Sequence, residues 1–279
     1  MARITTATIK EKKHRKERIT MLTSYDYSMA GMVDQAGIDM ILVGDSLGNV
    51  MLGYENTLAV TMDDMVHHTR AVVRAAKHAL VVADMPFLSY HISIEEAVRN
   101  AGRLIQEGGA QAVKIEGGTE RVETVKAILD AQIPVMGHIG LTPQSVNAFG
   151  GFKVQGKDLE TAQKLIRDAH AMDEAGVFAL VMECVPSELA KRITAEVSCP
   201  TIGIGAGPDC DGQVLVVNDM LGMYGGHIPK FVKKFADLQP VILEALKAYK
   251  QEVEAGTFPS AEHCFTIQDD VLDKLYGGS

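Results

Sequence analysis

The feature that most constrains the fold is a series of eight short β-branched runs, each ended by Gly, Pro or Asp. Such runs predict strands, and helical patterns such as 63–78 and 94–108 separate most of them. This alternation predicts one parallel sheet covered by helices, and eight strands are the number of a (β/α)8 TIM barrel. A doubly wound open sheet is the structural alternative. The predicted strands are 19–25, 40–45, 80–85, 112–117, 134–139, 179–184, 200–205 and 213–218.

The chain shows no long polar or Pro/Ser-rich stretch that would join two domains. Its 279 residues, 47% of them hydrophobic, match the length and apolar content of a barrel of roughly 250 residues. We therefore predict a single domain over residues 1–279. Residues 1–18 form an N-terminal arm or helix in this prediction, a further helix covers about 237–254, and 266–279 form a loose tail or a small packing helix.

The charge balance excludes some partners. A net charge of −9 argues against nucleic-acid binding, which needs a clustered basic surface. The one basic run, from Lys10 to Arg18, is short and interrupted by Glu11 and Glu17, which favours a solvated or capping segment over an interaction tail. No apolar stretch of about 18 residues predicts a membrane span or signal peptide, and the four cysteines show no CxxC spacing. We expect a cytoplasmic protein with reduced thiols.

Ionisable residues stand at the ends of several predicted strands. Side chains alternate between the two faces of a strand, so Lys114 and Glu116 share the inner face of 112–117 while Val113 and Ile115 face the helices. Along each inner face the first residues are apolar and the last residue is ionisable. The last residues lie at the carboxyl ends of the strands, where TIM-barrel enzymes carry their catalytic groups. The other predicted faces are Ile41, Val43 and Asp45; Val82 and Asp84; and Ala179, Val181 and Glu183.

Carboxylates that converge at one end of a barrel repel one another unless a cation lies between them. Oxygen ligands without a His or Cys cluster suit Mg²⁺ better than zinc, which predicts a magnesium site among the acids Asp45, Asp84, Glu116 and Glu183. Magnesium usually keeps one or two direct carboxylates, so at least one of these acids is expected to act through water. Lys114 either meets a substrate carboxylate or enolate, or forms a plain ion pair with a neighbouring acid.

Eight motifs in order identify a family that the chain resembles. They are GDSLG (44–48), ADMPF (83–87), VKIEGG (113–118), GHIGLTPQSVN (137–147), GGFKVQG (150–156), ECVP (183–186), IGIGAG (202–207) and GGHIPKF (225–231). Together they resemble the ketopantoate hydroxymethyltransferases, over residues 20–265. The tail after Phe265 has no counterpart in this resemblance.

The resemblance implies a (β/α)8 barrel that transfers a hydroxymethyl group from 5,10-methylenetetrahydrofolate to 3-methyl-2-oxobutanoate, giving 2-dehydropantoate for pantothenate synthesis. It implies one Mg²⁺ per subunit, surrounded by Asp45, Asp84 and Glu116. Asp45, Ser46, Asp84 and Lys114 correspond to the residues that bind the oxo acid, and Glu183 to the base that removes its C3 proton. It also implies a homo-oligomer, a decamer in bacterial members.

Two other functions stay open at this point. One is a magnesium-dependent lyase or mutase of the phosphoenolpyruvate mutase and isocitrate lyase type, although the KKCGH-type loop of those lyases is absent from the sequence. The other is a non-catalytic barrel that binds a metabolite, which would not need all five ionisable residues.

Four further features carry predictions. Segment 140–157 is expected to form a mobile lid, because long loops without regular structure are usually functional or disordered. His138 either bonds the substrate or fills the upper layer of the barrel. The glycines of IGIGAG are expected to allow close backbone approach at the barrel mouth in preference to phosphate binding. Cys184 should point away from the site because it follows Glu183.

Overall fold

The computed structural model describes residues 2–223, 225–226 and 228–275, and the strands of this part close into a barrel. Every neighbouring pair is parallel, and β8 pairs with β1, which confirms the (β/α)8 fold and excludes the open sheet. The strands are β1 Ile19–Thr23, β2 Met40–Val43, β3 Leu80–Asp84, β4 Ala112–Glu116, β5 Val135–Gly140, β6 Ala179–Glu183, β7 Thr201–Ile204 and β8 Gly212–Leu215.

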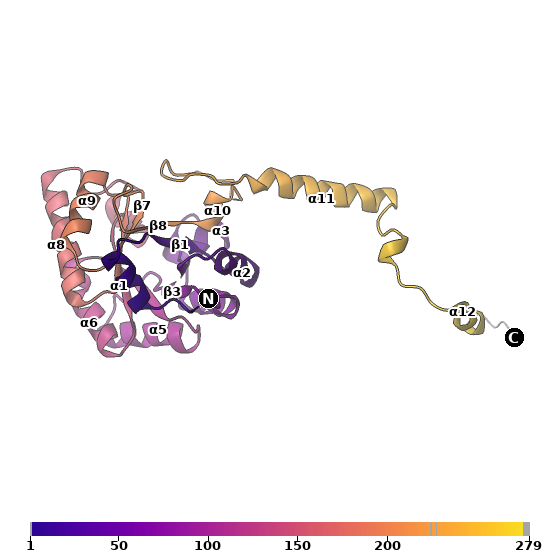
Figure 1. Ribbon diagram of the computed structural model, residues 1–279, viewed down its shortest axis with the longest axis horizontal. Helices are drawn as coiled ribbons and strands as arrows, with labels where there is room; N and C mark the ends of the chain where they lie inside the picture. Colours follow the sequence, from indigo (N-terminus) through magenta and orange to yellow (C-terminus); the bar gives the residue numbers. More distant parts are fainter. Residues whose placement is uncertain (1, 224, 227, 276–279) are drawn as a thin grey trace.

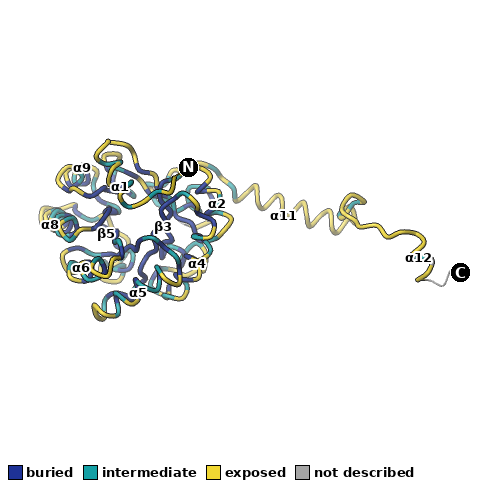
Figure 2. The backbone as a smooth tube through the Cα atoms, turned by 60° about the horizontal axis from the view of Figure 1, so that its bottom comes forward, coloured by how far each residue is buried: buried dark blue, intermediate teal, exposed yellow. Residues whose placement is uncertain are grey.

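Helices surround the strands as an outer layer, so the buried residues, dark blue in Figure 2, lie mainly inside the ring of helices. The main covering helices are α2 Tyr27–Gln35, α4 Met62–Ala75, α5 Ile94–Gln106, α6 Val122–Asp130, α8 Leu159–Ala175 and α9 Ser187–Glu196. The short helices are α3 Leu47–Val50, α7 Val146–Phe149 and α10 Val217–Met220. Single 3-10 turns cover Thr57–Ala59, Thr119–Arg121, Pro143–Ser145 and Ala261–His263.

The two faces of the barrel sheet bury separate apolar clusters. The interior holds Leu80 and Val82 from β3, Ala112 from β4, and Ala179 and Val181 from β6, among others. The outer cluster packs the opposite faces of the same strands against the helices. This alternation matches the faces predicted for β3, β4 and β6, so polar residues at the ends of their inner faces come together above a packed core.

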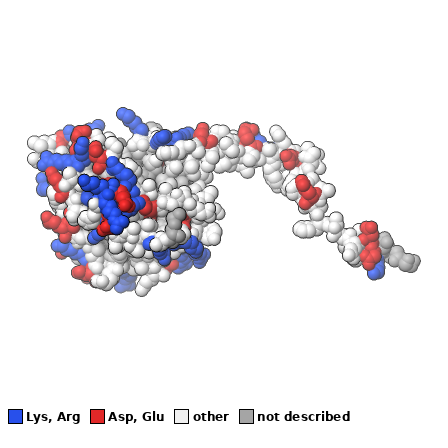
Figure 3. Space-filling view, in the orientation of Figure 1, with Lys and Arg blue, Asp and Glu red and all other residues white. Residues whose placement is uncertain are grey.

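The N-terminal helix α1 (Thr6–His14) closes one end of the barrel (Figure 1). Its Ile9 is fully buried within the interior cluster. Lys12 Nζ lies 2.6 Å from Asp39 Oδ1, and Lys13 Nζ lies 3.0 Å from Asp211 Oδ2. Lys and Arg side chains, with some Asp and Glu among them, gather on the face of the barrel where α1 lies (Figure 3). The basic run therefore covers one end of the barrel within α1 and just after it, which leaves the opposite end of the barrel open for chemistry.

Helix α11 (Leu238–Ala255) projects away from the barrel, and α12 (Asp269–Leu275) lies at the far end of the segment that follows α11 (Figure 1). Of the described residues of α11, none is buried. Large apolar side chains are exposed along its length, including Leu246 and Tyr249 at 61% each. Within the described residues, no helix combines the length and low charge content that crossing a membrane requires.

Asp34 ties α2 to the chain before β3 and carries a prediction for stability. Its carboxylate accepts hydrogen bonds from the backbone N–H groups of Lys77, His78 and Ala79, at 3.0, 2.9 and 2.8 Å. Burial alone would raise the pKa of Asp34, but these hydrogen bonds outweigh burial and lower it. We expect Asp34→Asn to reduce the free energy of unfolding at pH 7 by about 1–3 kcal/mol.

The pH dependence of this effect follows from the sign of the shift. A lowered folded-state pKa stabilises the protein fully above the unfolded value of about 3.9, and this stabilisation is lost as pH falls through the folded value. The difference between wild type and Asp34→Asn in urea unfolding should therefore shrink below about pH 4. Exposed Asp130→Asn is the control and should leave stability unchanged. A difference that grows on acidification would contradict the assignment.

Candidate active site

The predicted ionisable residues meet at the carboxyl ends of the strands. Asp84, Glu116 and Glu183 are the last residues of β3, β4 and β6, and Asp45 follows β2 after a single glycine. The register aligns Asp84 with Lys114 and Glu116 with His138 across neighbouring strands. The structure therefore brings together the groups that the sequence pattern placed at one end of the barrel.

The face predicted for β2 is wrong, although Asp45 reaches the site. Ile41 and Val43 pack outward in the cluster beneath the helices, whereas Met40 and Leu42 fill the interior. The strand ends at Val43, and the chain turns before Asp45, so strict alternation does not extend to that residue. The Asp45 backbone N–H donates to Asp84 Oδ2 at 3.2 Å, which holds the two aspartates side by side.

Lys114 lies among three buried carboxylates. Its Nζ is 2.6 Å from Asp84 Oδ1 and 3.9 Å from Glu116 Oε1, and each of these side chains is at most 4% exposed. Burial alone would lower the pKa of Lys114, but the charges of Asp84, Glu116 and Asp45 outweigh it and raise the pKa. Lys114 is therefore a fixed cation in a low-dielectric site, where an anionic substrate group or an enolate would be stabilised.

The three carboxylates respond differently to this environment. Burial, reinforced by the charges of Asp84 and Glu116, raises the pKa of Asp45 well above its ordinary value. The pKa of Asp84 is also raised, chiefly by burial, against the opposing charge of Lys114. Burial would raise the pKa of Glu116 as well, but His138, Lys114 and the Gln144 backbone N–H together lower it. The two aspartates are thus short of positive charge, which a bound cation would supply.

The donor set also limits how a cation could be held. In the described part of the chain, no group of three or more His, Cys, Asp or Glu side chains is arranged to hold a metal. The available donors are carboxylate oxygens, of which Asp84 Oδ1 already faces Lys114 Nζ at 2.6 Å and Glu116 Oε1 faces His138 Nδ1 at 3.4 Å. Hard cations take such oxygens as ligands, and Mg²⁺ usually binds only one or two protein carboxylates. The residues fit a cation on the two aspartates better than one held directly by three acids.

His138 links Glu116 to Glu183. Its Nδ1 is 3.4 Å from Glu116 Oε1, and its Nε2 is 3.3 Å from Glu183 Oε2. Burial and Lys114 lower the pKa of His138, but the two carboxylates outweigh them and raise it to about 9. Glu183 is more open than its neighbours, with a side chain 16% exposed. The histidine therefore holds a partly open carboxylate in place, as a general base requires.

Gly140, the last residue of β5, allows the close approach that positions Glu183. Its φ is +95°, and a Cβ at this position would overlap the backbone oxygen of Glu183. The Leu141 N–H donates to that same oxygen at 2.8 Å. Cys184, the next residue, has a φ of +49° and half-buried surroundings that raise the pKa of its thiol to about 12. It is a poor nucleophile at neutral pH.

Ser46 lies next to Asp45, at the start of α3, where the sequence predicts a substrate-binding hydroxyl. Its Oγ is 2.8 Å from the hydroxyl of Tyr25, a fully buried side chain of the outer core. Gly44 keeps this corner compact, because a Cβ there would lie 2.8 Å from the Ser46 Oγ. The local fold therefore fixes the hydroxyl beside the aspartates.

Gln144 and Tyr90 are site residues that the sequence reasoning missed. The Gln144 Nε2 donates to Asp45 Oδ2 at 2.9 Å, and its backbone N–H donates to Glu116 Oε2 at 3.1 Å. The Tyr90 hydroxyl donates to Gln144 Oε1 at 2.6 Å. Gln144 belongs to segment 140–157, so the beginning of the predicted lid is anchored to the acids in this structure. No strand periodicity covers either residue; Gln144 falls within the motif GHIGLTPQSVN, whereas Tyr90 lies three residues beyond ADMPF and belongs to no motif.

The glycines of IGIGAG pack closely against side chains. A Cβ on Gly205 would lie 2.8 Å from the ring of Phe231, and a Cβ on Gly207 would lie 2.6 Å from the Cβ of Ser187. Both glycines have positive φ. These contacts confirm close backbone approach at this end of β7.

Solved structures with a similar fold include enzymes of the predicted alternative class. A 2,3-dimethylmalate lyase of the PEP mutase/isocitrate lyase superfamily superposes with a TM-score of 0.59, 15% identity, and coverage of 98% of this chain and 94% of that chain. Phosphonopyruvate hydrolase in complex with oxalate and Mg²⁺ gives a TM-score of 0.59 at 13% identity, with the same coverage. At such low identity these likenesses establish the barrel fold alone.

Sequence relatives match almost the whole chain. A protein of Syntrophomonas wolfei, named 3-methyl-2-oxobutanoate hydroxymethyltransferase, is 76% identical over 276 residues, which cover 99% of this chain and 100% of the relative. A Clostridium novyi protein of the same name is 64% identical, covering 98% and 99%. This coverage reaches into the tail after Phe265, so the expectation that the tail lacks a counterpart is wrong. The profile described as Ketopantoate hydroxymethyltransferase matches residues 3–261. The chain belongs to the ketopantoate hydroxymethyltransferase family.

Proposed function

We propose that this protein transfers a hydroxymethyl group from 5,10-methylenetetrahydrofolate to 3-methyl-2-oxobutanoate and forms 2-dehydropantoate. The family match over residues 3–261 and relatives up to 76% identical support this assignment. The observation that carries the mechanism is the buried cluster of Asp45, Asp84, Lys114 and Glu116 beside Glu183. A lyase or mutase of the PEP mutase type is disfavoured, because the full-length relatives bear the transferase name.

In this proposal the oxo acid lies between Asp45, Ser46, Asp84 and Lys114. Mg²⁺ would be held by Asp45 and Asp84, with Glu116 acting through water. When bound, the cation supplies Lewis-acid stabilisation for charge that develops on the 2-oxo oxygen. Lys114 adds a fixed positive charge on the same side, close to Asp84. The Gln144 backbone N–H orients Glu116, which would contact the cation through a water molecule.

Glu183 is the proposed base. Its carboxylate takes the proton from C3 of the oxo acid and leaves an enolate, whose C3 then forms the new bond to the methylene carbon of the folate. That carbon leaves both folate nitrogens, which take up protons as tetrahydrofolate forms, and a water molecule provides the hydroxyl group. His138, 3.3 Å from Glu183, orients the carboxylate toward the proton.

Proton exchange at C3 tests this function without the folate. We expect the enzyme with Mg²⁺ to exchange the C3 hydrogen of 3-methyl-2-oxobutanoate for deuterium, as followed by NMR in D₂O. Removal of the cation with a chelator should slow the exchange by about 10²-fold or more, because Lewis-acid stabilisation is worth several kcal/mol. Addition of 5,10-methylenetetrahydrofolate should then yield 2-dehydropantoate. Exchange that is indifferent to the chelator would contradict the metal assignment.

The proposal includes a cytoplasmic enzyme with small-molecule substrates. All four cysteines are free thiols in the structure, and Cys199 and Cys210 are buried, which supports a reducing compartment. The net charge of −9 gives no support to nucleic-acid binding.

We also propose a homo-oligomer, with the decamer as the expected form. The apolar side chains of α11 support it, because an amphipathic or apolar helix is normally buried against a partner. Leu246→Glu places a charge on this surface and should shift the protein to a smaller species in sedimentation velocity. Gln163→Glu, on the exposed side of α8, is the control. An unchanged sedimentation coefficient for Leu246→Glu would remove α11 from the interface.

A further inference from the structure

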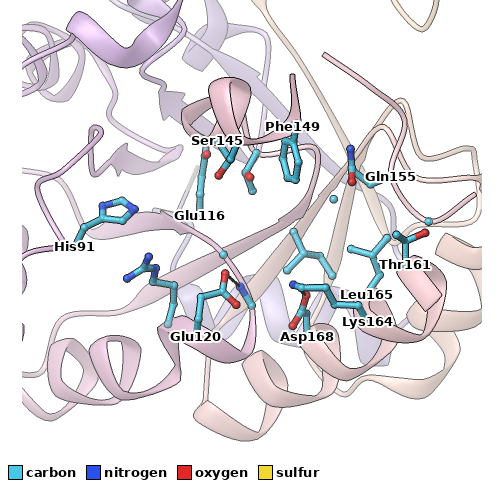
Figure 4. A pocket seen from close by; sticks show the side chains of 18 of the residues that line it. His91, Glu116, Glu120, Ser145, Phe149, Gln155, Thr161, Lys164, Leu165 and Asp168 are labelled. Atoms are coloured by element: carbon cyan, nitrogen blue, oxygen red, sulfur yellow. Dashed lines mark hydrogen bonds and ion pairs between the residues drawn. The ribbon is translucent and has the colours of Figure 1, made fainter. Parts of the chain in front are cut away.

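A cavity of about 270 Å³ opens beside the acid cluster (Figure 4). The turn after β4 forms one side of it, the segment from Thr142 to Phe149 forms another, and the first turns of α8 form a third. Glu116 lines the cavity as well as the site described above. Asp45, Asp84 and Lys114 do not line it, so it is a second compartment that shares one wall with the place proposed for the oxo acid.

The lining favours a flat ring with a polar edge. Ile139, Leu165 and Phe149 provide apolar surface, and Arg121 and Gln155 provide hydrogen-bonding groups. Glycines at 117, 118, 140 and 156 also line it, and the protein's own atoms fill the space that a Cβ would take at each of them. The volume lies just under the roughly 300–1,000 Å³ of sites that enclose whole drug-sized ligands. The cavity therefore has room for one ring system, while a longer ligand would extend outside it.

Unsatisfied polar atoms mark the end of the cavity that adjoins the reaction site. His91 Nδ1 is buried and has no hydrogen-bond partner within the described residues, and Glu116 Oε1 has only the longer ion-pair contacts to His138 and Lys114, at 3.4 and 3.9 Å. His91 stacks on Tyr90 with ring centroids 4.1 Å apart, and Tyr90 is fixed by its bond to Gln144. Buried polar atoms without partners cost about 1–3 kcal/mol each, which a ligand with complementary groups would recover.

We propose that this cavity binds the pterin ring of the one-carbon donor, a site that rests on the proposed transferase function. A pterin ring is planar and carries amide and amino groups along one edge, which matches apolar walls with a polar rim. Its position across Glu116 from the oxo-acid compartment would bring the methylene carbon toward C3 of the acceptor. The exposed Lys153 and Lys157 flank Gln155 outside the cavity, where the glutamate carboxylates of the donor would extend.

Two tryptophan substitutions on different sides of the cavity test this site. Thr161→Trp fills it from α8, and Ala148→Trp fills it from α7. Each should raise the KM for 5,10-methylenetetrahydrofolate by about tenfold or more, because the lost binding is steric. The C3 exchange of the oxo acid without folate should persist in both, since its groups lie in the other compartment. Gln163→Trp, on the exposed side of α8, is the matched control and should leave the KM for folate unchanged.

A ring fragment provides a test that does not depend on turnover. The probe is a tetrahydropterin that lacks the benzoylglutamate part, and it should inhibit transfer competitively with the folate in wild type and in Gln163→Trp. Inhibition should be lost in Thr161→Trp. An unchanged KM for folate in both cavity variants, with melting temperatures equal to wild type, would overturn the site. Absence of C3 exchange in the wild-type enzyme would instead overturn the proposed function, so the two failures are distinguishable.

Discussion

Replacement of Glu183 by Gln is expected to slow C3 proton exchange in 3-methyl-2-oxobutanoate by about 10²–10⁴-fold, the usual contribution of a positioned base. Glutamine keeps the size of the side chain and its place 3.3 Å from His138, but it cannot accept the proton. None of the contacts recorded around the Asp84 and Lys114 pair involves Glu183 in the described residues, so the affinity for the oxo acid should change little. The expected signature is a low kcat with a nearly normal KM.

The control for this variant lies a few residues along the chain. Glu188 is exposed on α9, and Glu188→Gln makes the same chemical change outside the site. Its exchange rate should equal that of wild type. If Glu183→Gln retained full exchange, another group at the mouth would have to be the base. His138 would be a poor choice, because its raised pKa of about 9 leaves it protonated at neutral pH.

Alternation along strands was sufficient to predict most of the acid cluster. Asp84, Glu116 and Glu183 are strand residues, so a period of two fixes the face on which each lies once the neighbouring residues are known to be buried. The barrel then brings the ends of these strands together without further information. Side-chain alternation does not predict the position of Asp45, because this residue lies beyond the end of β2. Its arrival at the site depends on a turn at Gly44, which no periodicity describes.

The groups that orient the cluster could not be predicted in this way. Gln144 contacts Asp45, which is 99 residues away in the sequence, and Tyr90 contacts Gln144 across 54 residues. Such contacts depend on where two loops meet over the barrel, and loop positions carry no hydrophobic period. His138 was a strand residue with two open roles. Only the distances to Glu116 and Glu183 show that it bridges the carboxylates.

The C-terminal region shows a further limit of sequence patterns. The helix predicted over about 237–254 forms as α11, but its sequence does not say what the helix packs against. In the described residues its apolar side chains contact no buried core, so its partner must come from beyond the single chain or the helix would remain solvated. Hydrophobic periodicity predicts the helix, but what the helix packs against is known only from the three-dimensional structure or the assembly.

Replacement of Lys114 by Met is the second change with a large expected effect. Methionine has a similar length and no charge, so it removes the cation that lies 2.6 Å from Asp84 while the volume of the side chain is largely kept. Loss of one preorganised charge beside a developing oxyanion typically lowers kcat by about 10²–10³-fold. We expect this loss in the transfer assay, together with a raised KM for the oxo acid, whose carboxylate would lose its partner.

The same substitution should act in the opposite sense on the metal. Lys114 would compete with the proposed cation for the negative charge of Asp45 and Asp84, since its own charge opposes the burial that raises the pKa of both acids. Without Lys114 the affinity for Mg²⁺, measured by isothermal titration calorimetry near neutral pH, should stay equal or increase. Exposed Lys126→Met on α6 should change neither quantity. Weaker Mg²⁺ binding in Lys114→Met would mean that Lys114 holds the aspartates in place for the metal, and its assignment to the substrate would then be wrong.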